Sequence, residues 1–165
     1  MEFHMAGLSI VKFPKNILTR RAAKVPAVGD DERKTLAEMA KTMYLNGGVG
    51  LAAVQVGIDR QLAVVDTGKG LIKMVNPVMV KSEGSETAEE GCLSVPDTAV
   101  KIKRAKKIVV QYLNEFGEIS QITAEGLLAR AIQHEIDHLS GKLIIDYLSP
   151  IKRMFLRKNP KKITP

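Results

Sequence analysis

The sequence AEGLLARAIQHEIDHLSG, residues 124–141, decides the expected fold. Apolar residues recur in it at helical spacing, and Gly141 is a typical helix stop, so we predict a helix over residues 124–140. Four apolar residues of this helix are expected to pack against a sheet: Leu127, Leu128, Ala131 and Leu139. We therefore expect this helix to be the central element of the fold.

Two further helices are expected on either side of it. Residues 30–46 predict an amphipathic helix, which Asp30 can cap and which Gly47 and Gly48 end. A C-terminal helix is expected to start after Pro150 and to fray near Pro160.

The remaining elements read as strands. Four β-rich segments occupy residues 61–66, 71–80, 107–113 and 118–124. The last two flank a hairpin signal at residues 114–117, and Pro77 indicates that the second is an edge strand or is bent. Because strands and helices do not alternate one for one, we predict an α+β fold: a mixed or antiparallel sheet packed around the central helix, with a C-terminal helix.

Length and composition favour one ordinary folded domain over residues 1–165. No apolar run approaches the roughly 18 residues that cross a bilayer, and the first residues lack a signal-peptide layout, so no membrane association is expected. We interpret residues 1–5 as a leader or an alternative start at Met5 and set them aside. The single cysteine, Cys92, excludes an internal disulfide and favours a reducing, cytoplasmic location.

The pentad HEIDH, residues 134–138, is the clearest chemical signal. His134 and His138 lie one turn apart on a helix and can bind one metal ion, while Glu135 can reach a metal-activated water as a general base. The alternative is a pair of surface histidines. A catalytic site needs a third protein ligand, and Cys92 is a better candidate than His4, which lies in the suspected leader.

A glycine-rich stretch, residues 47–57, is the second candidate segment. It matches neither a dinucleotide fingerprint nor a phosphate loop. Its small residues would let a substrate backbone approach closely, and Gln55 offers an uncharged amide donor for an oxyanion. An ordinary glycine-rich turn after a helix is the alternative.

Three motifs in order give the chain a resemblance to the peptide deformylases: GVGLAAVQ at residues 48–55, EGCLS at 90–94 and HEIDH at 134–138. The similarity extends over nearly the whole chain from about Leu8. It implies removal of the formyl group from the N-terminal methionine of nascent polypeptides, with release of formate. It also implies ferrous iron on Cys92, His134 and His138, a site that zinc, nickel or cobalt can also occupy.

The same resemblance assigns the other catalytic roles. Glu135 would take a proton from the attacking water and pass it to the departing amine. The side-chain amide of Gln55 and the backbone N–H of Leu93 would stabilise the oxyanion, and Gly50 would approach the substrate backbone.

The methionine pocket is expected to involve Val49, Leu127, Ala131 and the face of His134, and Glu90 is also expected to contact substrate. Arg130 departs from the family pattern, in which this position is usually aliphatic. It either extends outward with its stem against the pocket or narrows and polarises the pocket. The arginine that some relatives carry after Pro96 is absent here. Asp137 is expected to orient a ligand histidine, to pair with Arg104, or simply to be exposed.

The net charge is +7, and basic residues cluster at 101–107 and after Pro150. In relatives such a tail can dock onto the ribosome, although a solvated basic face is the simpler reading. Two rival functions stay open. A general metalloprotease would need a later histidine or carboxylate ligand, and no histidine follows His138. A non-enzymatic module with a structural metal would need a fourth protein ligand.

Overall fold

The computed structural model describes residues 7–159. Their three α-helices are α1 (Asp30–Leu45), α2 (Gly126–Leu139) and α3 (Pro150–Lys158). The strands are β1 (Gly50–Ala52), β2 (Leu62–Val65), β3 (Ile72–Glu83), β4 (Glu86–Cys92), β5 (Val95–Arg104), β6 (Lys107–Leu113) and β7 (Ile119–Glu125). Short 3-10 helices occupy η1 (Asn16–Thr19), η2 (Ala53–Val56) and η3 (Ile144–Tyr147).

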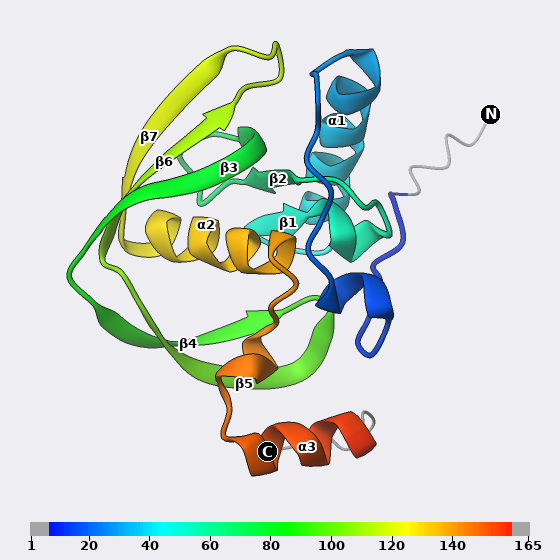
Figure 1. The fold of residues 1–165 in the computed structure, drawn as a ribbon, viewed down its shortest axis with the longest axis vertical. Coiled ribbons are helices and arrows are strands. Elements are labelled where there is room, and N and C mark those ends of the chain that lie inside the picture. The colour runs from blue at the N-terminus through cyan, green and yellow to red at the C-terminus, as the bar shows by residue number, and fades with distance from the viewer. Residues whose placement is uncertain (1–6, 160–165) are drawn as a thin grey trace.

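The strands form two antiparallel units. One sheet has the order β1-β2-β3-β6-β7, and β4 and β5 pair separately as a ribbon. α2 lies between the sheet and the ribbon, and α1 packs beside β1 and β2 (Figure 1). The predicted α+β fold with a central helix and a C-terminal helix is confirmed, and its sheet is antiparallel.

Two apolar cores flank the sheet because successive strand residues point to opposite faces. On one face, Ala63 and Val65 of β2 pack with Ile132 of α2. On the other face, Leu62 and Val64 pack with α1. α2 is thus covered by β-structure on two sides, which fixes the orientation of its histidines.

The first predicted helix forms, but its cap differs. Gly29 is the N-cap, and the carboxylate of Glu32 accepts a hydrogen bond from the Gly29 N–H at 2.9 Å. Asp30 is the first helical residue, so the prediction that Asp30 caps this helix was wrong. Its carboxylate lies instead in the first turn, where a negative charge interacts favourably with the helix dipole.

Pro77 lies in an interior strand, since β3 pairs with both β2 and β6. The register with β6 shifts between Val75 and Val78, so the missing N–H of Pro77 falls in a β-bulge. β3 is not an edge strand as a whole, but its ladder with β2 ends at Val75, so Pro77 lies beyond that ladder and next to β6 alone.

The packing of α2 differs from the prediction at one position. Ala131 and Leu139 are buried, and Leu128 packs partly against the same core. Leu127, however, is 59% exposed, because the core-facing stripe runs through Ala129, Ile132 and Leu139.

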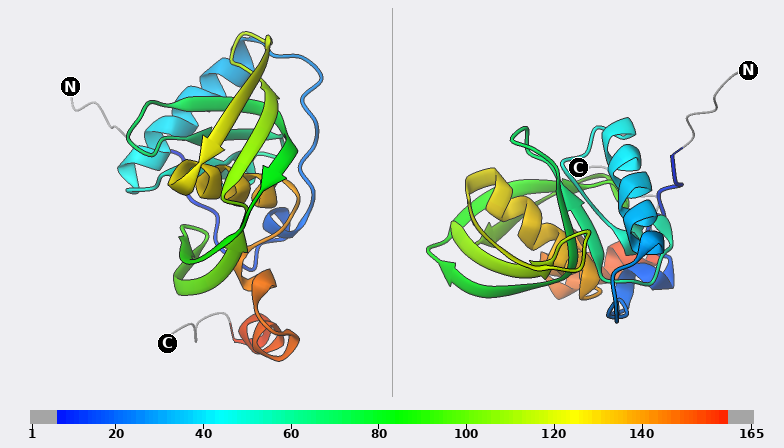
Figure 2. Two further views of the ribbon diagram at one scale, coloured as in Figure 1. Left: turned by 90° about the vertical axis from the view of Figure 1, so that its left-hand side faces the viewer. Right: turned by 90° about the horizontal axis from the view of Figure 1, so that it is seen from above.

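The predicted C-terminal helix is present as α3, which begins at Pro150 itself and stands apart from the sheet and α2 (Figure 2). Pro160, near which fraying is expected, lies outside the described residues. Its buried residue is Leu156, and Arg153 and Arg157 lie near Asp146. In the described part of the chain, no helix is both long and apolar enough to cross a membrane.

Candidate active site

Two elements bring the predicted metal ligands together. Cys92 ends β4, and His134 and His138 lie one turn apart on α2. His138 Nε2 lies 3.1 Å from His134 Nε2 and 3.3 Å from Cys92 Sγ. Within residues 7–159 these three residues form a group whose ligand atoms all lie within 4.8 Å of one another.

The two distances to His138 are close to those expected around a single metal ion. Ligands held tetrahedrally at about 2.0–2.3 Å would lie about 3.4–3.6 Å from one another. Burial lowers the pKa of His138 well below its ordinary value, which keeps the ring neutral as a ligand must be. A thiolate with two imidazoles suits a soft or borderline ion and leaves the fourth position of a catalytic site open.

Glu90 supports the first histidine from behind. Its Oε2 lies 2.9 Å from His134 Nδ1, so this nitrogen donates to Glu90 while Nε2 faces the other ligands. Arg104 holds both oxygens of Glu90, at 2.9 and 3.0 Å. Burial raises the pKa of the Glu90 carboxyl, but hydrogen bonds from His134, Arg104 and Arg130 outweigh it and bring the pKa to about 2. Glu90 is therefore a buried anion behind the metal ligands.

Arg104 ties this carboxylate to a second one. Its Nη1 donates to Asp137 Oδ2 at 2.6 Å and to the Tyr147 hydroxyl at 2.9 Å, and that hydroxyl donates to Asp137 at 2.6 Å. The predicted pairing of Asp137 with Arg104 is confirmed, and the partner of His134 is Glu90.

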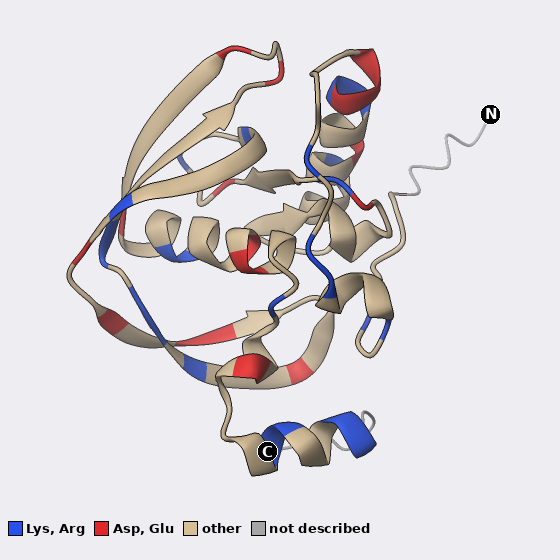
Figure 3. Cartoon of the chain, in the orientation of Figure 1, with Lys and Arg blue, Asp and Glu red and all other residues tan. Residues whose placement is uncertain are grey.

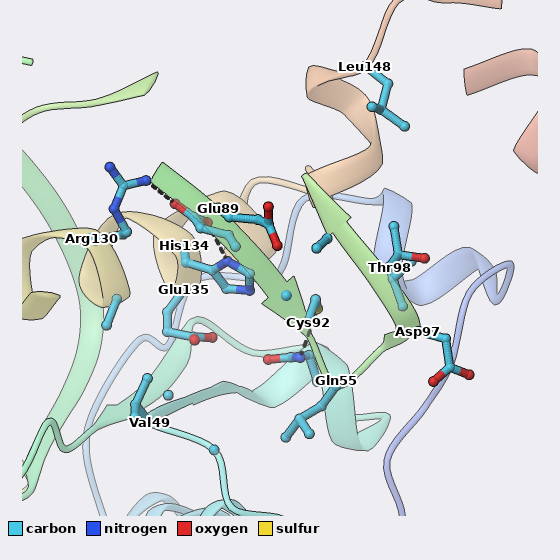
Figure 4. Close-up of a pocket in the computed structure, with 18 of the residues that line it drawn as sticks. Val49, Gln55, Glu89, Cys92, Asp97, Thr98, Arg130, His134, Glu135 and Leu148 are labelled. Atoms are coloured by element: carbon cyan, nitrogen blue, oxygen red, sulfur yellow. Dashed lines mark hydrogen bonds and ion pairs between the residues drawn. The ribbon is translucent and has the colours of Figure 1, made fainter. Parts of the chain in front are cut away.

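Arg130 connects α2 to both strands of the ribbon. It donates to Glu90 Oε1 at 2.7 Å, to the carbonyl of Ile102 at 3.0 Å and to the carbonyl of Glu86 at 2.8 Å. Its side chain is 11% exposed, so the alternative in which it extends outward was wrong. Arg130 clamps the ribbon that carries Cys92 onto the helix that carries the histidines (Figure 4).

Glu135 lies buried beside the ligands. Its Oε2 has no hydrogen-bond partner among the described residues, and burial raises its pKa to about 7. A Cβ added to Gly50 would lie 2.3 Å from Glu135 Oε1. Gly50 is therefore needed for the glutamate itself, a constraint that sequence reasoning missed.

Gln55 approaches the same point from η2. Its Oε1 accepts from the Ala52 N–H at 2.9 Å, which turns Nε2 toward Ser94 Oγ at 3.3 Å and Cys92 Sγ at 3.7 Å (Figure 4). The amide is thus fixed with a donor directed toward the thiolate.

One cavity of about 1350 Å³ joins most of the residues predicted for the site. Those that line it are Val49, Gly50, Gln55, Glu90, Cys92, Leu93, Leu127, Arg130, Ala131, His134 and Glu135. His138 does not line the cavity and is buried. Leu127, Ala131 and His134 share a helix face, which explains why Leu127 faces the cavity instead of the core.

Sequence reasoning missed the contribution of the chain after Tyr147. Leu148, Ile151, Lys152 and Phe155 also line the cavity. The amphipathic pattern after Pro150 was the available signal, but the side on which that helix docks depends on η3 and could not be inferred from it.

Comparison with known proteins agrees with this geometry. The family model described as polypeptide deformylase matches residues 8–154. A peptide deformylase of Thermodesulfovibrio yellowstonii is 45% identical over 159 residues, covering 93% of this chain and 96% of its own.

Two solved structures have the same fold. A Legionella pneumophila peptide deformylase is 43% identical, with a TM-score of 0.88 and coverage of 95% of both chains. An Ehrlichia chaffeensis peptide deformylase in complex with actinonin is 39% identical, with a TM-score of 0.90 over 95% of this chain and 97% of its own.

Proposed function

The chain belongs to the peptide deformylase family of metal-dependent hydrolases, and we propose that its Cys92, His134, His138 and Glu135 are the residues that remove the formyl group from N-terminal formylmethionine. The observation that carries this proposal is the convergence of three ligand atoms beside a buried carboxylate, that of Glu135, whose Oε2 has no hydrogen-bond partner among residues 7–159. The whole chain, residues 1–165, would act as one domain.

Cys92, His134 and His138 would hold the metal, and we assign ferrous iron to it. When bound, the ion supplies Lewis acidity and lowers the pKa of water. Glu90 would fix the ring of His134 and increase its basicity as a ligand, because it accepts the Nδ1 proton. Arg130 and Arg104 would in turn hold Glu90 and the ribbon in place.

Glu135 would accept the proton of the attacking water and deliver it to the departing amine. A carboxyl whose pKa is about 7 is suited to both transfers near neutral pH. No described residue forms a hydrogen bond with Glu135 Oε2, so this oxygen is available to the reactants.

Gln55 and Leu93 would stabilise the oxyanion that develops on the formyl oxygen, through the Nε2 amide and the backbone N–H. Gln55 is pre-oriented because Ala52 and Ser94 hold its two ends. Such a donor needs no reorganisation during the reaction.

Val49, Leu127 and Ala131 would enclose the methionine side chain, with Arg130 closing one side of the pocket. Because its guanidinium is already bound to Glu90 and two carbonyl groups, Arg130 would shape this pocket through its stem. Gly50 would leave room for the substrate backbone.

The reaction would take place in the cytoplasm on nascent chains, and basic residues on α3 are compatible with docking onto the ribosome (Figure 3). The predicted tail residues Lys161 and Lys162 lie outside the described residues, as do His4 and the leader 1–5. A chain ending at Pro150 should co-sediment less with ribosomes at low salt. Unchanged co-sedimentation would contradict the docking.

The function is tested by formate release from formyl-Met-Ala-Ser, after metal removal and anaerobic reconstitution with iron(II), zinc, nickel or cobalt. We expect no turnover by the metal-free protein and the highest kcat with iron. Inactivity with every ion, each shown to be bound, would contradict the proposed function. Activity that is higher with another ion would contradict the assignment of iron alone.

A further inference from the structure

The five-stranded sheet has two outer strands, β1 and β7, and only β1 lies at the catalytic cavity. Gly50 of β1 lines that cavity, whereas no residue of β7 (Ile119–Glu125) does. β7 forms the left-hand edge of the sheet in Figure 1, and its ladder with β6 has no register shift. This end of the sheet is therefore a regular free edge, away from the reaction.

Backbone groups of β7 point away from β6. Just beyond one end of the ladder, the Asn114 N–H donates to the Glu118 carbonyl at 2.9 Å. Beyond the other end, the Gly126 N–H donates to the Lys106 carbonyl at 3.2 Å. Because hydrogen-bonded pairs alternate with non-bonded pairs in an antiparallel ladder, the odd-numbered residues of β7 direct their N–H and C=O groups outward. Before the cap of α2, these are Ile119, Gln121 and Thr123. Among residues 7–159, no second strand pairs with these outward groups.

β7 lacks the features that usually keep an exposed edge from pairing, which are lysine, proline and bulges. The neighbouring ribbon has such features, since β5 contains Pro96, Lys101 and Lys103. β7 contains neither lysine nor proline, and its one charged residue, Glu125, stands at its end. Ile119, at the other end, is 82% exposed. The edge between them is neutral and open to another strand.

We propose that β7 is the interface for a second copy of this chain, which pairs antiparallel through its own β7 and continues the sheet across two molecules. In the register that overlaps the whole strand, Ile122 lies on the two-fold axis beside Ile122 of the second copy. Gln121 then stands opposite Thr123 of the second copy, so that the outward-pointing backbone groups meet, as a hydrogen-bonded ladder requires.

The side chains favour a second copy over other partners. Ile122 packs partly against the core that includes α2, so pairing at the two-fold axis extends an existing apolar core. Glu125 faces Ile119 of the second copy, so no two charges meet, although chains of net charge +7 repel one another elsewhere. A nucleic acid would instead need a basic edge.

Sedimentation velocity of the metal-loaded full chain measures the association. One strand pair is a small interface, so we expect a reversible dimer with a dissociation constant of roughly 10–100 µM. Amide hydrogen exchange, followed by NMR, identifies the surface. Exchange at Ile119, Gln121 and Thr123 should slow about three- to fivefold between about 10 and 500 µM protein, as the monomer fraction falls. The amides of Ser120 and Ile122 already bond to β6 and should not change.

Gln121→Pro removes one outward N–H from each copy, and the ladder with β6 does not use that group. The dissociation constant should rise about 10- to 100-fold, as expected for the loss of two hydrogen bonds. A second pair of variants is matched in charge. Gln111 lies opposite Gln121 on β6, one strand further from the edge, and both are exposed. Gln121→Lys should weaken the dimer at least about fivefold, while Gln111→Lys should stay within about twofold of the parent.

A parent that stays monomeric up to about 500 µM would overturn the proposal and leave the edge to a strand of some other protein. So would a dimer in which Gln121→Lys and Gln111→Lys have the same dissociation constant, since another surface would then join the copies. Unchanged exchange at the three outward amides in the dimer would overturn it for the same reason. If circular dichroism shows that Gln121→Pro does not fold, the two lysine variants decide the outcome.

Discussion

Oε2 of Glu90 accepts a hydrogen bond from Nδ1 of His134 at 2.9 Å, which links a strand residue two positions before Cys92 to the first histidine of the helix. The same carboxylate is bound by Arg104 and Arg130. The ligands and their support therefore form one buried network, and each part of it can be tested separately.

The acid dependence of stability should reveal the anionic state of Glu90. Its pKa in the folded protein is about 2, below the ordinary 4.5, so its stabilisation is present above pH 4.5 and is lost as the pH falls toward 2. The shift corresponds to about 3 kcal/mol at most. The unfolding free energies of metal-free parent and Glu90→Gln should therefore converge between pH 6 and pH 3 in urea titrations. A difference that stays constant over this range would contradict an anionic Glu90.

Cys92 should be detectable as a ligand by spectroscopy. Because it is the only cysteine, thiolate-to-metal charge transfer in the cobalt-substituted protein can come from no other residue. Cys92→Ser should lose this absorption and bind cobalt more weakly, while Ser94→Ala should retain it. An unchanged band in Cys92→Ser would exclude the thiolate ligand.

Arg130 should stabilise both the fold and the metal site. Arg130→Leu removes one of the donors to Glu90 and the side-chain donor to the carbonyl groups of Glu86 and Ile102, at a cost of about 1–3 kcal/mol in unfolding free energy. Competition with a chelator should show weaker metal binding as well. Arg153→Leu is the matched control, since its contact with Asp146 is long and partly exposed, and it should cost less than about 1 kcal/mol. Equal losses of unfolding free energy in Arg130→Leu and Arg153→Leu would show that Arg130 does not hold the ribbon onto α2.

Gly50 should be intolerant of even one methyl group. In Gly50→Ala the new carbon would lie 2.3 Å from Glu135 Oε1, so the carboxylate must move. We expect kcat to fall about 100-fold or more, since general acid–base catalysis contributes 10²–10⁴. Bound metal should be retained. Gly29→Ala, whose Cβ lies 3.6 Å from Glu32 Oε2, should keep the parent kcat. A fully active Gly50→Ala would refute the close packing.

The helical spacing of HEIDH and the lone cysteine made the ligand group predictable, because both signals are local or compositional. The support around it depends on tertiary register. Glu90 meets Arg104 and His134 only because β4 pairs with β5 and both pack against α2. The position of Leu127 was wrong for a related reason: periodicity identifies an apolar face, but the same helix lines both a core and a cavity.

The helix cap and the position of Pro77 also depend on tertiary structure, which local sequence patterns do not predict. Gly29 replaces Asp30 as the N-cap because Glu32 can fold back onto its N–H, an interaction that depends on the entry of the chain. Pro77 is tolerated in β3 because it lies in a bulge opposite β6 and beyond the end of the β2 ladder, where its missing N–H is not needed. The side on which α3 meets the cavity depends on the turn through η3, for which the sequence carries no simple pattern.

The most direct test of the account compares parent and Glu135→Gln, both loaded anaerobically with iron(II), with metal content measured beside formate release from formyl-Met-Ala-Ser. We expect one bound ion in each protein, rapid formate release by the parent, and a rate about 100- to 10,000-fold lower in the variant. Comparable rates in the two proteins, at equal metal content, would contradict the role of Glu135 as the base.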